Sequence, residues 1–253
     1  MELEFVLLLL ALFVIAILYS SVGHGGASGY LAVLSLTSYG LMEHVWLKQH
    51  VWFLNLLVSS LAFYHYNKQG FHEIKLSFPF IIASIPMAFI GGYMIIDGMI
   101  YDILLSITLI WAAYKLYYIN TKEYSEYIKF PTNKQAIPWG AGIGFASGII
   151  GVGGGIFLSP IILIKKWANP KTVASTAALF IFVNSIAGLA GASVSGQLIL
   201  DIDILIYFTI AVFTGGFIGS YWGSKIASQE LIQKILVIVL LTAASKRIIE
   251  LLL

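Results

Sequence analysis

The feature that most constrains this chain is a succession of long apolar runs separated by short polar segments. A helix needs about 20 mostly apolar residues to cross a bilayer, and runs such as 3–22, 45–66 and 202–223 reach that length. The composition agrees, because 59% of the 253 residues are hydrophobic and only 10% are charged, whereas soluble domains carry about 25% charged residues. We therefore expect an all-α polytopic membrane protein without a soluble domain.

Three of the expected helices are too short to cross a bilayer alone. These are 30–38, 136–150 and 156–164, and each adjoins a cluster of glycines. The first run follows Glu2 and Glu4 rather than a positively charged segment, so we expect a retained helix and not a signal peptide. The complete set of expected helices is 3–22, 30–38, 45–66, 76–96, 101–119, 136–150, 156–164, 173–191, 202–223 and 231–253.

Charge and motif content exclude several classes of protein. The net charge of +2 gives no basic surface of the kind that binds nucleic acid. The chain has no cysteine, and it contains no HExxH motif, nucleophile elbow, phosphate-binding loop or pair of carboxylates within an apolar run. We therefore expect neither an enzyme nor a protein with a cofactor or a metal. Any transport activity is expected to be passive or driven by a gradient.

The two halves of the sequence resemble each other at one constant offset. Segment 89–93 matches segment 217–221 in four of five residues after a shift of 128, and one residue of slack adds Asn55 on Asn184. Two clusters that share one offset predict an internal duplication. We expect an N-terminal repeat at 1–119, a linker at 120–135 and a C-terminal repeat at 136–253. The same shift also places Gly23, Gly25 and Gly26 on Gly151, Gly153 and Gly154.

The distribution of Lys and Arg indicates how the short segments lie, because these residues concentrate on the cytoplasmic side of a membrane. If each glycine-broken segment crosses the membrane, the 14 Lys and Arg residues divide almost evenly between the two sides. If each segment instead folds back as a hairpin, all but Lys48, Lys246 and Arg247 fall on one side. Each half then has three crossings and one hairpin. The second half is therefore expected to be an inverted copy of the first, with the linker in the cytoplasm and both termini outside.

The glycine clusters at 23–26 and 151–155 mark the expected breaks. Backbone that leaves helical geometry inside a bilayer needs protein or a watery cavity to satisfy its amides. Helices that start just after the breaks, near Ala27 and Ile156, would direct unpaired N–H groups and positive helix ends toward them, which favours an anion site. The alternative is that the glycines only allow helices to pack closely. The duplication of the cluster favours the anion site.

Segment 147–160, SGIIGVGGGIFLSP, resembles the glycine-rich signature ending in proline of the TauE/SafE family of sulfite exporters. The N-terminal segment SVGHGG resembles a degenerate copy of it. His24 and Ala27 stand opposite Val152 and Gly155, so the two half-sites are expected to be unequal. The resemblance covers essentially the whole chain. It implies export of sulfite, a related oxyanion or an organosulfonate across the cytoplasmic membrane.

The expected substrate-binding residues combine the glycines of both breaks with neutral polar side chains near them. Serine hydroxyls that bond to their own helix and asparagines that bond between helices are the alternatives to ligand contact. His24 is expected either to pack as a neutral ring or to couple anion movement to protons. Lys48 is expected to extend to the outer surface, with a lean toward the anion as the alternative, and His50 and His65 are expected to be solvated. The complete set is Ser21, Gly23, His24, Gly25, Gly26, Gln49, Asn55, Gly151, Gly153, Gly154, Gly155, Ser175, Thr176 and Asn184.

These features together predict a secondary transporter of the cell membrane that exports a small sulfur-containing anion by alternating access. Its expected partners are the anion and the lipid bilayer. Protons as the coupling ion and a homodimer as the assembly are further hypotheses. A passive anion channel with the same fold and a non-transporting membrane subunit or assembly factor are the alternatives.

Overall fold

The computed structural model describes residues 2–35, 37–94 and 129–228, and beyond them residues 230, 231, 234, 235 and 238. The expected helix 101–119, most of 231–253 and residues 120–128 of the expected linker lie outside these residues. Within them, every regular element is a helix, as the apolar pattern predicts. The elements are α1 (Glu2–Ser20), α2 (Ala27–Ser35), the 3-10 helix η1 (Ser38–Leu41), α3 (His44–Lys68), α4 (Ile74–Tyr93), α6 (Asn133–Ile150), α7 (Gly155–Ile164), α8 (Pro170–Val194) and α9 (Ile202–Lys225).

Four of the described helices, α1, α4, α8 and α9, are long and apolar enough to cross a membrane. Helices α6 and α8 begin three residues before the expected positions, because each starts after a polar capping residue that precedes the apolar run. Thr132 and Gln135 form a capping box at the start of α6, within the range expected as the linker. Asn169 caps α8 by accepting a hydrogen bond from Thr172 N–H, and Pro170 follows it.

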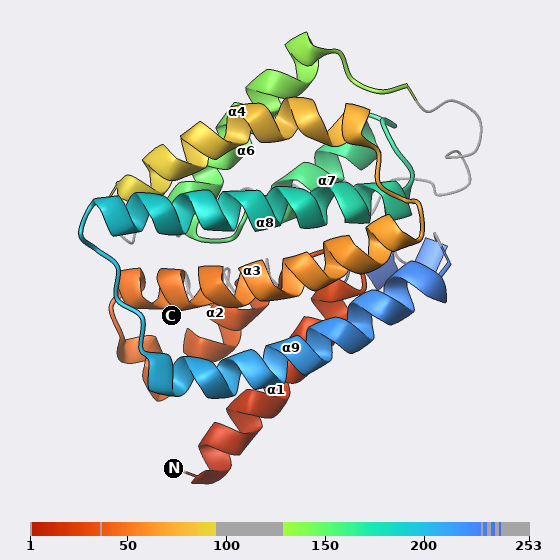
Figure 1. Ribbon diagram of the computed structural model, residues 1–253. Coiled ribbons are helices and arrows are strands. Elements are labelled where there is room, and N and C mark those ends of the chain that lie inside the picture. The colour runs from red at the N-terminus through yellow and green to blue at the C-terminus, as the bar shows by residue number, and fades with distance from the viewer. Residues whose placement is uncertain are drawn as a thin grey trace.

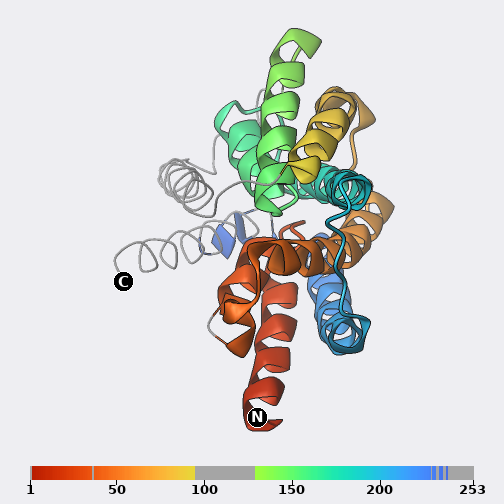
Figure 2. The ribbon, with the colours of Figure 1, turned by 90° about the vertical axis from the view of Figure 1, so that its left-hand side faces the viewer.

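The described helices form two groups that meet along α3 and α8. In the α3 group, α1 and α3 pack against α9 and α2 lies beside them; in the α8 group, α4 packs against α6 and α8, and α7 against α8. Figure 1 shows the two groups one above the other, and Figure 2 shows them from the side. Helices α4 and α9 are therefore exchanged between the halves of the sequence, because each packs mainly against helices of the other half.

Matched aromatic contacts join each exchanged helix to the hairpin of the other half. Phe208 of α9 contacts Phe5 near the start of α1 and Tyr39 just after α2. Phe80 of α4 contacts Trp167, which follows α7, and its backbone touches α6. Tyr39 and Trp167 are 128 residues apart, and so are Phe80 and Phe208. The two contacts are therefore equivalent under the repeat offset. Each hairpin thus returns to the end of the molecule that it left.

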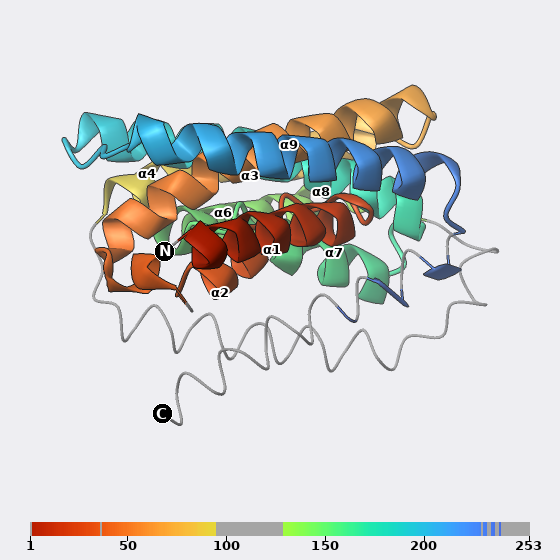
Figure 3. The ribbon, with the colours of Figure 1, turned by 90° about the horizontal axis from the view of Figure 1, so that it is seen from below.

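Glycines spaced four residues apart allow two pairs of helices to pack with their backbones in contact. Figure 3 shows one of these pairs, α1 and α9, side by side; the other is α4 with α6. A Cβ atom at these glycines would overlap the facing carbonyl groups, so here the small residue serves close packing. The glycines are Gly215, Gly219 and Gly223 in α9, against α1, and Gly140, Gly144 and Gly148 in α6, against α4.

The two ends of the molecule differ in charge. At one end, Lys171 Nζ donates a hydrogen bond to the Ser224 carbonyl at 3.1 Å and lies 5.0 Å from the centroid of the Phe71 ring. These contacts bring together the start of α8, the end of α9 and the α3–α4 turn. This Lys-rich end carries Lys68, Lys75, Lys165, Lys166, Lys171 and Lys225. The opposite, acidic end holds the start of α3 and the 195–201 connection, with Glu43, Asp201 and Asp203.

Gln49 and His50 fasten α3 to the 195–201 connection at the acidic end. Both amide atoms of Gln49 bond to backbone groups of the connection, each at 2.6 Å. His50 Nε2 accepts a hydrogen bond from Asp201 N–H at 2.9 Å.

His50 is thus held within the fold, and so is His65 near the other end of α3, whose Nδ1 forms a hydrogen bond with the Ser220 hydroxyl at 2.8 Å. Both histidines are buried, so the expectation that they are solvated at helix ends is wrong.

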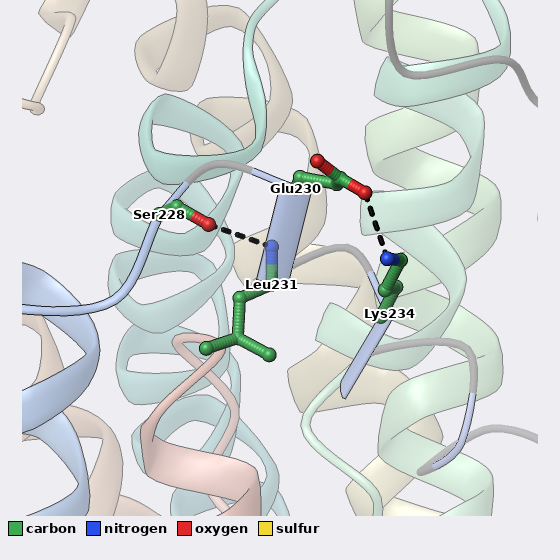
Figure 4. Close-up of polar contacts among 4 residues, drawn as sticks. All are labelled: Ser228, Glu230, Leu231 and Lys234. Atoms are coloured by element: carbon green, nitrogen blue, oxygen red, sulfur yellow. Dashed lines mark hydrogen bonds and ion pairs between the residues drawn. The ribbon is translucent and has the colours of Figure 1, made fainter.

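After α9 the chain turns at Ser228, whose hydroxyl accepts a hydrogen bond from Leu231 N–H at 3.1 Å in the manner of an N-cap (Figure 4). Lys234 forms an ion pair with Glu230 at 2.7 Å (Figure 4). Both side chains of this pair are more than half exposed, so it adds little stability.

Candidate functional site

Both hairpins are interrupted where glycines adopt left-handed backbone angles. Gly23 (φ +77°) and Gly151 (φ +86°) follow the first helix of each hairpin, and Gly26 (φ +99°) and Gly154 (φ +81°) precede the second. These angles strain any residue with a Cβ atom. Two of the three glycine pairs related by the shift of 128 therefore share the left-handed region, whereas Gly153 (φ +72°) is left-handed and Gly25 is not. Helix α2 begins at Ala27, the start expected from the glycine cluster and three residues before the apolar run 30–38, and α7 begins one residue before the expected start.

Asn55 of α3 touches both breaks. A Cβ atom at Gly25 would overlap Asn55 Oδ1, and a Cβ atom at Gly153 would lie 2.5 Å from Asn55 Nδ2. The side chain is fully buried, and neither amide atom has a hydrogen-bond partner among the described residues. A buried amide without partners costs free energy. Its place between the breaks makes it a candidate ligand-binding group.

A small pocket lies between the two breaks, with room for about one water molecule. The first residues of α2 line it, and Ile156 contributes the first turn of α7. The N–H groups of a first helical turn have no partner within the helix and carry partial positive charge. Two helix N-termini therefore converge on one pocket. The complete lining is 24–28, Tyr19, Asn55, Val152, Ile156 and Ile181.

Further buried polar side chains on α6 and α8 have no hydrogen-bond partners in the described part of the chain, and some of them lie near the breaks. Ser147 of α6 and Ser185 of α8 lie near break glycines, with Ser185 Oγ 3.3 Å from the position of a Cβ atom at Gly153. Ser175 and Thr176 follow Ala174, whose carbonyl lies against Gly23. Asn184 has both amide atoms unpartnered. All five of these polar side chains are fully buried.

His24 links the two hairpins. Its Nδ1 lies 3.0 Å from the Val22 carbonyl, and its Nε2 lies 3.3 Å from Ser159 Oγ in α7. A carbonyl oxygen only accepts, so Nδ1–H donates to Val22, and Nε2 faces the Ser159 hydroxyl. The ring is buried and also lines the pocket. His24 thus joins the two hairpins and borders the pocket.

Lys48 leans inward, and the expectation that it extends to the outer surface is wrong. Its aliphatic stem packs against Gly151 at the second break. Its Nζ lies 4.9 Å from the centroid of the Trp52 ring, one helical turn further from the start of α3. The absence of a side chain at Gly151 gives the stem room, and the indole ring gives the ammonium group a cation–π partner.

The structure brings four of the expected substrate-binding residues together at the pocket: His24, Gly25, Gly26 and Asn55. Gly153 lies against Asn55. Gly23, Gly151, Gly154 and Gly155 form the rest of the two breaks, and Ser175, Thr176 and Asn184 lie on α8.

Two expected residues have partners elsewhere. The Ser21 hydroxyl donates to the Leu18 carbonyl of its own helix at 2.7 Å, and Gln49 is bonded to the 195–201 connection. Sequence reasoning missed Ser28, Ile181 and Ser185. Ser185 adjoins Asn184 in an apolar run, which is a signal that could have identified it.

The fold and the pocket define a multi-pass α-helical membrane protein whose two broken hairpins converge on a polar site. The family model for the sulfite exporter TauE/SafE matches residues 8–247. The chain belongs to this family of membrane transporters. It is 33% identical over 249 residues to the "Probable membrane transporter protein y4hK" of Sinorhizobium fredii (strain NBRC 101917 / NGR234), covering 97% of this chain and 99% of that protein. No solved structure matches the chain.

Proposed function

We propose that this protein is a secondary transporter that exports a small sulfur-containing anion, sulfite or a related oxyanion or organosulfonate. The observation that carries the proposal is the convergence of the N-termini of α2 and α7 on a pocket that Asn55 also lines. The Asn55 amide has no hydrogen-bond partner among the described residues. Unpaired N–H groups at helix ends bind anions without a cationic side chain. The sulfur-containing substrate is inferred from the family description.

Alternating access in this protein is proposed to involve the α3 group and the α8 group. Two inverted repeats, 1–119 and 136–253, with a cytoplasmic linker at 120–135, would place one broken hairpin in each group. The matched contacts of Phe208 and Phe80 support this repeat. Because α4 and α9 are exchanged, the bodies that move are the two groups rather than the two halves of the sequence.

The Lys-rich end is proposed to face the cytoplasm, because Lys and Arg concentrate there in membrane proteins. The acidic end, where α1 begins beside α9, would then face outward and place the N-terminus outside. The cell membrane is the proposed location, and export is the proposed direction.

Counterflow in proteoliposomes tests the proposal. Vesicles loaded with unlabelled sulfite should accumulate labelled sulfite transiently, with saturable rates, if the protein is a carrier. A passive channel would equilibrate the label without overshoot, and a non-transporting subunit would move none. An imposed pH gradient that drives uptake without internal sulfite would identify protons as the coupling ion.

Three glycine variants locate the anion path. A leucine at position 25 or 153 would fill the space beside Asn55, so Gly25→Leu and Gly153→Leu should abolish counterflow. Gly142 lies in α6, and a Cβ atom added there would have no atom of the described residues within 4 Å, so Gly142→Leu is the matched control and should exchange sulfite normally. Normal exchange by the first two variants, once they are shown to be folded, would place the path elsewhere.

A further inference from the structure

Helices α3 and α9 end side by side at the Lys-rich end, and each ends with the same pair of residue types. The two helices pack against each other and both start at the acidic end, so their last turns are neighbours (Figure 1). In α3 Tyr64 is followed four residues later by Lys68, and in α9 Tyr221 is followed by Lys225 in the same way. Residues four apart share one face of a helix.

Both lysines are held by the tyrosine of their own helix. Lys68 Nζ lies 5.6 Å from the centroid of the Tyr64 ring, and Lys225 Nζ lies 4.6 Å from that of Tyr221. The Tyr221 hydroxyl also accepts a hydrogen bond from Lys225 Nζ at 3.2 Å. All four side chains are exposed. Neither lysine forms an ion pair within the described part of the chain, so both ammonium groups have donors free for a ligand.

The buried ring of His65 joins the two pairs. Its centroid lies 5.3 Å from that of Tyr64 and 5.8 Å from that of Tyr221. The hydrogen bond of His65 to the Ser220 hydroxyl, at 2.8 Å, fixes this ring between α3 and α9. The two tyrosines and the histidine therefore form one aromatic row with a lysine at each end. We call the two tyrosines and the two lysines the paired-lysine site.

Positive charge exceeds negative charge around this site. Lys171 Nζ donates to the carbonyl of Ser224, the penultimate residue of α9, so a third lysine lies at the end of this helix. Among the described residues of this end, the carboxylates belong to Glu73, just before α4, and to Glu230, which is paired with Lys234. Like charges gathered at one end repel one another. A bound anion would remove that cost.

The surface that leads to the site is apolar and exposed. Helix α9 is long and apolar enough to cross a membrane, and large apolar side chains spaced three or four residues apart form a stripe along it toward Tyr221. Each of them is about half exposed: Ile206, Ile210, Phe213 and Phe217. In a bilayer this stripe faces acyl chains, and Lys225 follows it where the head groups begin. An occupant with a charged head and an apolar tail matches both parts of the surface.

We propose that the paired-lysine site binds the head group of an anionic phospholipid, such as phosphatidylglycerol. Lys68 and Lys225 would hold the phosphate group, and an acyl chain would lie along the stripe of α9. Basic clusters between membrane helices commonly bind anionic head groups. A zwitterionic lipid brings a positive charge of its own, and a free phosphate ion would leave the stripe unused. None of the four residues lines the pocket between the breaks, so the inference does not depend on the transported anion.

Native mass spectrometry of the full chain, titrated in detergent with phosphatidylglycerol or phosphatidylcholine, tests the inference. The native protein should bind phosphatidylglycerol at concentrations at which phosphatidylcholine does not bind. In the double variant Lys68→Gln/Lys225→Gln, the phosphatidylglycerol concentration for half-saturation should rise about thirtyfold, because each basic residue contributes a factor of about five.

A second double variant separates a site from a general effect of charge. Lys75→Gln/Lys165→Gln removes two exposed lysines from the same end and should keep the native half-saturation value. Equal weakening by both double variants would show that only the net charge of this end matters, which would overturn the site. Equal binding of the two lipids by the native protein would also overturn it. Displacement of phosphatidylglycerol by millimolar inorganic phosphate would assign the lysines to a soluble anion and refute the lipid as occupant.

Discussion

Replacing Asn55 by leucine should stabilise the protein and abolish transport at the same time. Asn55 is fully buried between Gly25 and Gly153, and its Oδ1 and Nδ2 have no hydrogen-bond partner among the described residues. Leucine has the same branched shape without polar atoms. The variant thus removes two unsatisfied groups from the protein and, with them, two groups that would bind the anion.

The expected gain in stability follows from the cost of unsatisfied groups. A buried donor or acceptor without a partner costs roughly 1–3 kcal/mol, and Asn55 has one of each. A volume-conserving exchange of a buried side chain costs up to about 1.5 kcal/mol through imperfect packing. We therefore expect Asn55→Leu to raise the free energy of unfolding by about 2 kcal/mol. Functional sites commonly retain such costly groups, because binding depends on them.

Unfolding in mixed micelles, followed by circular dichroism, measures the stability, and sulfite counterflow measures the activity. Asn67 is exposed near the end of α3, so Asn67→Leu is the matched control and should change neither quantity appreciably. An Asn55→Leu protein that is less stable than the native protein would show that the amide is satisfied in the fold. Undiminished counterflow by that variant would exclude Asn55 from the anion path.

Three further substitutions test the surrounding structure. Gly219→Leu should prevent folding, because its side chain would enter the backbone of α1, whereas Gly142→Leu should fold; equal yields of folded protein would contradict the α1–α9 packing. Gln49→Leu should lower the free energy of unfolding by about 2 kcal/mol, because two backbone groups lose their partner, and should leave the affinity for sulfite unchanged; a weaker affinity would place Gln49 in the site after all. His24→Leu should lower the free energy of unfolding by about 2 kcal/mol by removing the link to Ser159; an unchanged melting curve would refute that link.

The sequence was sufficient to predict the breaks, because the glycines that adopt left-handed angles there stand in clusters within apolar runs. The clusters at 23–26 and 151–155, repeated at one offset inside apolar runs, indicated where helices end and restart. The starts of α2 and α7 accordingly lie at or one residue from the predicted positions. The Lys distribution pointed to hairpins, since it depends only on which end of the molecule each loop reaches.

The packing of the helices was not predictable in the same way. Apolar side chains face lipid and protein alike, so an apolar run does not reveal its neighbours. The exchange of α4 and α9 between the halves was missed for this reason, although the four-residue spacing of Gly140, Gly144 and Gly148 offered a clue. Gln49 was assigned to the site because it is polar and near a helix start, whereas its partners lie in the distant 195–201 connection.

Alternating access requires that the pocket between the two breaks holds the anion and opens alternately to both sides of the membrane. The chain contains no cysteine, so Ser28→Cys introduces a single thiol into the lining of the pocket. Membrane-impermeant maleimide should label this thiol when added to either side of proteoliposomes with oriented protein, and methanesulfonate should slow labelling from both sides. Labelling from one side only, at a rate that no sulfonate changes, would contradict the claim.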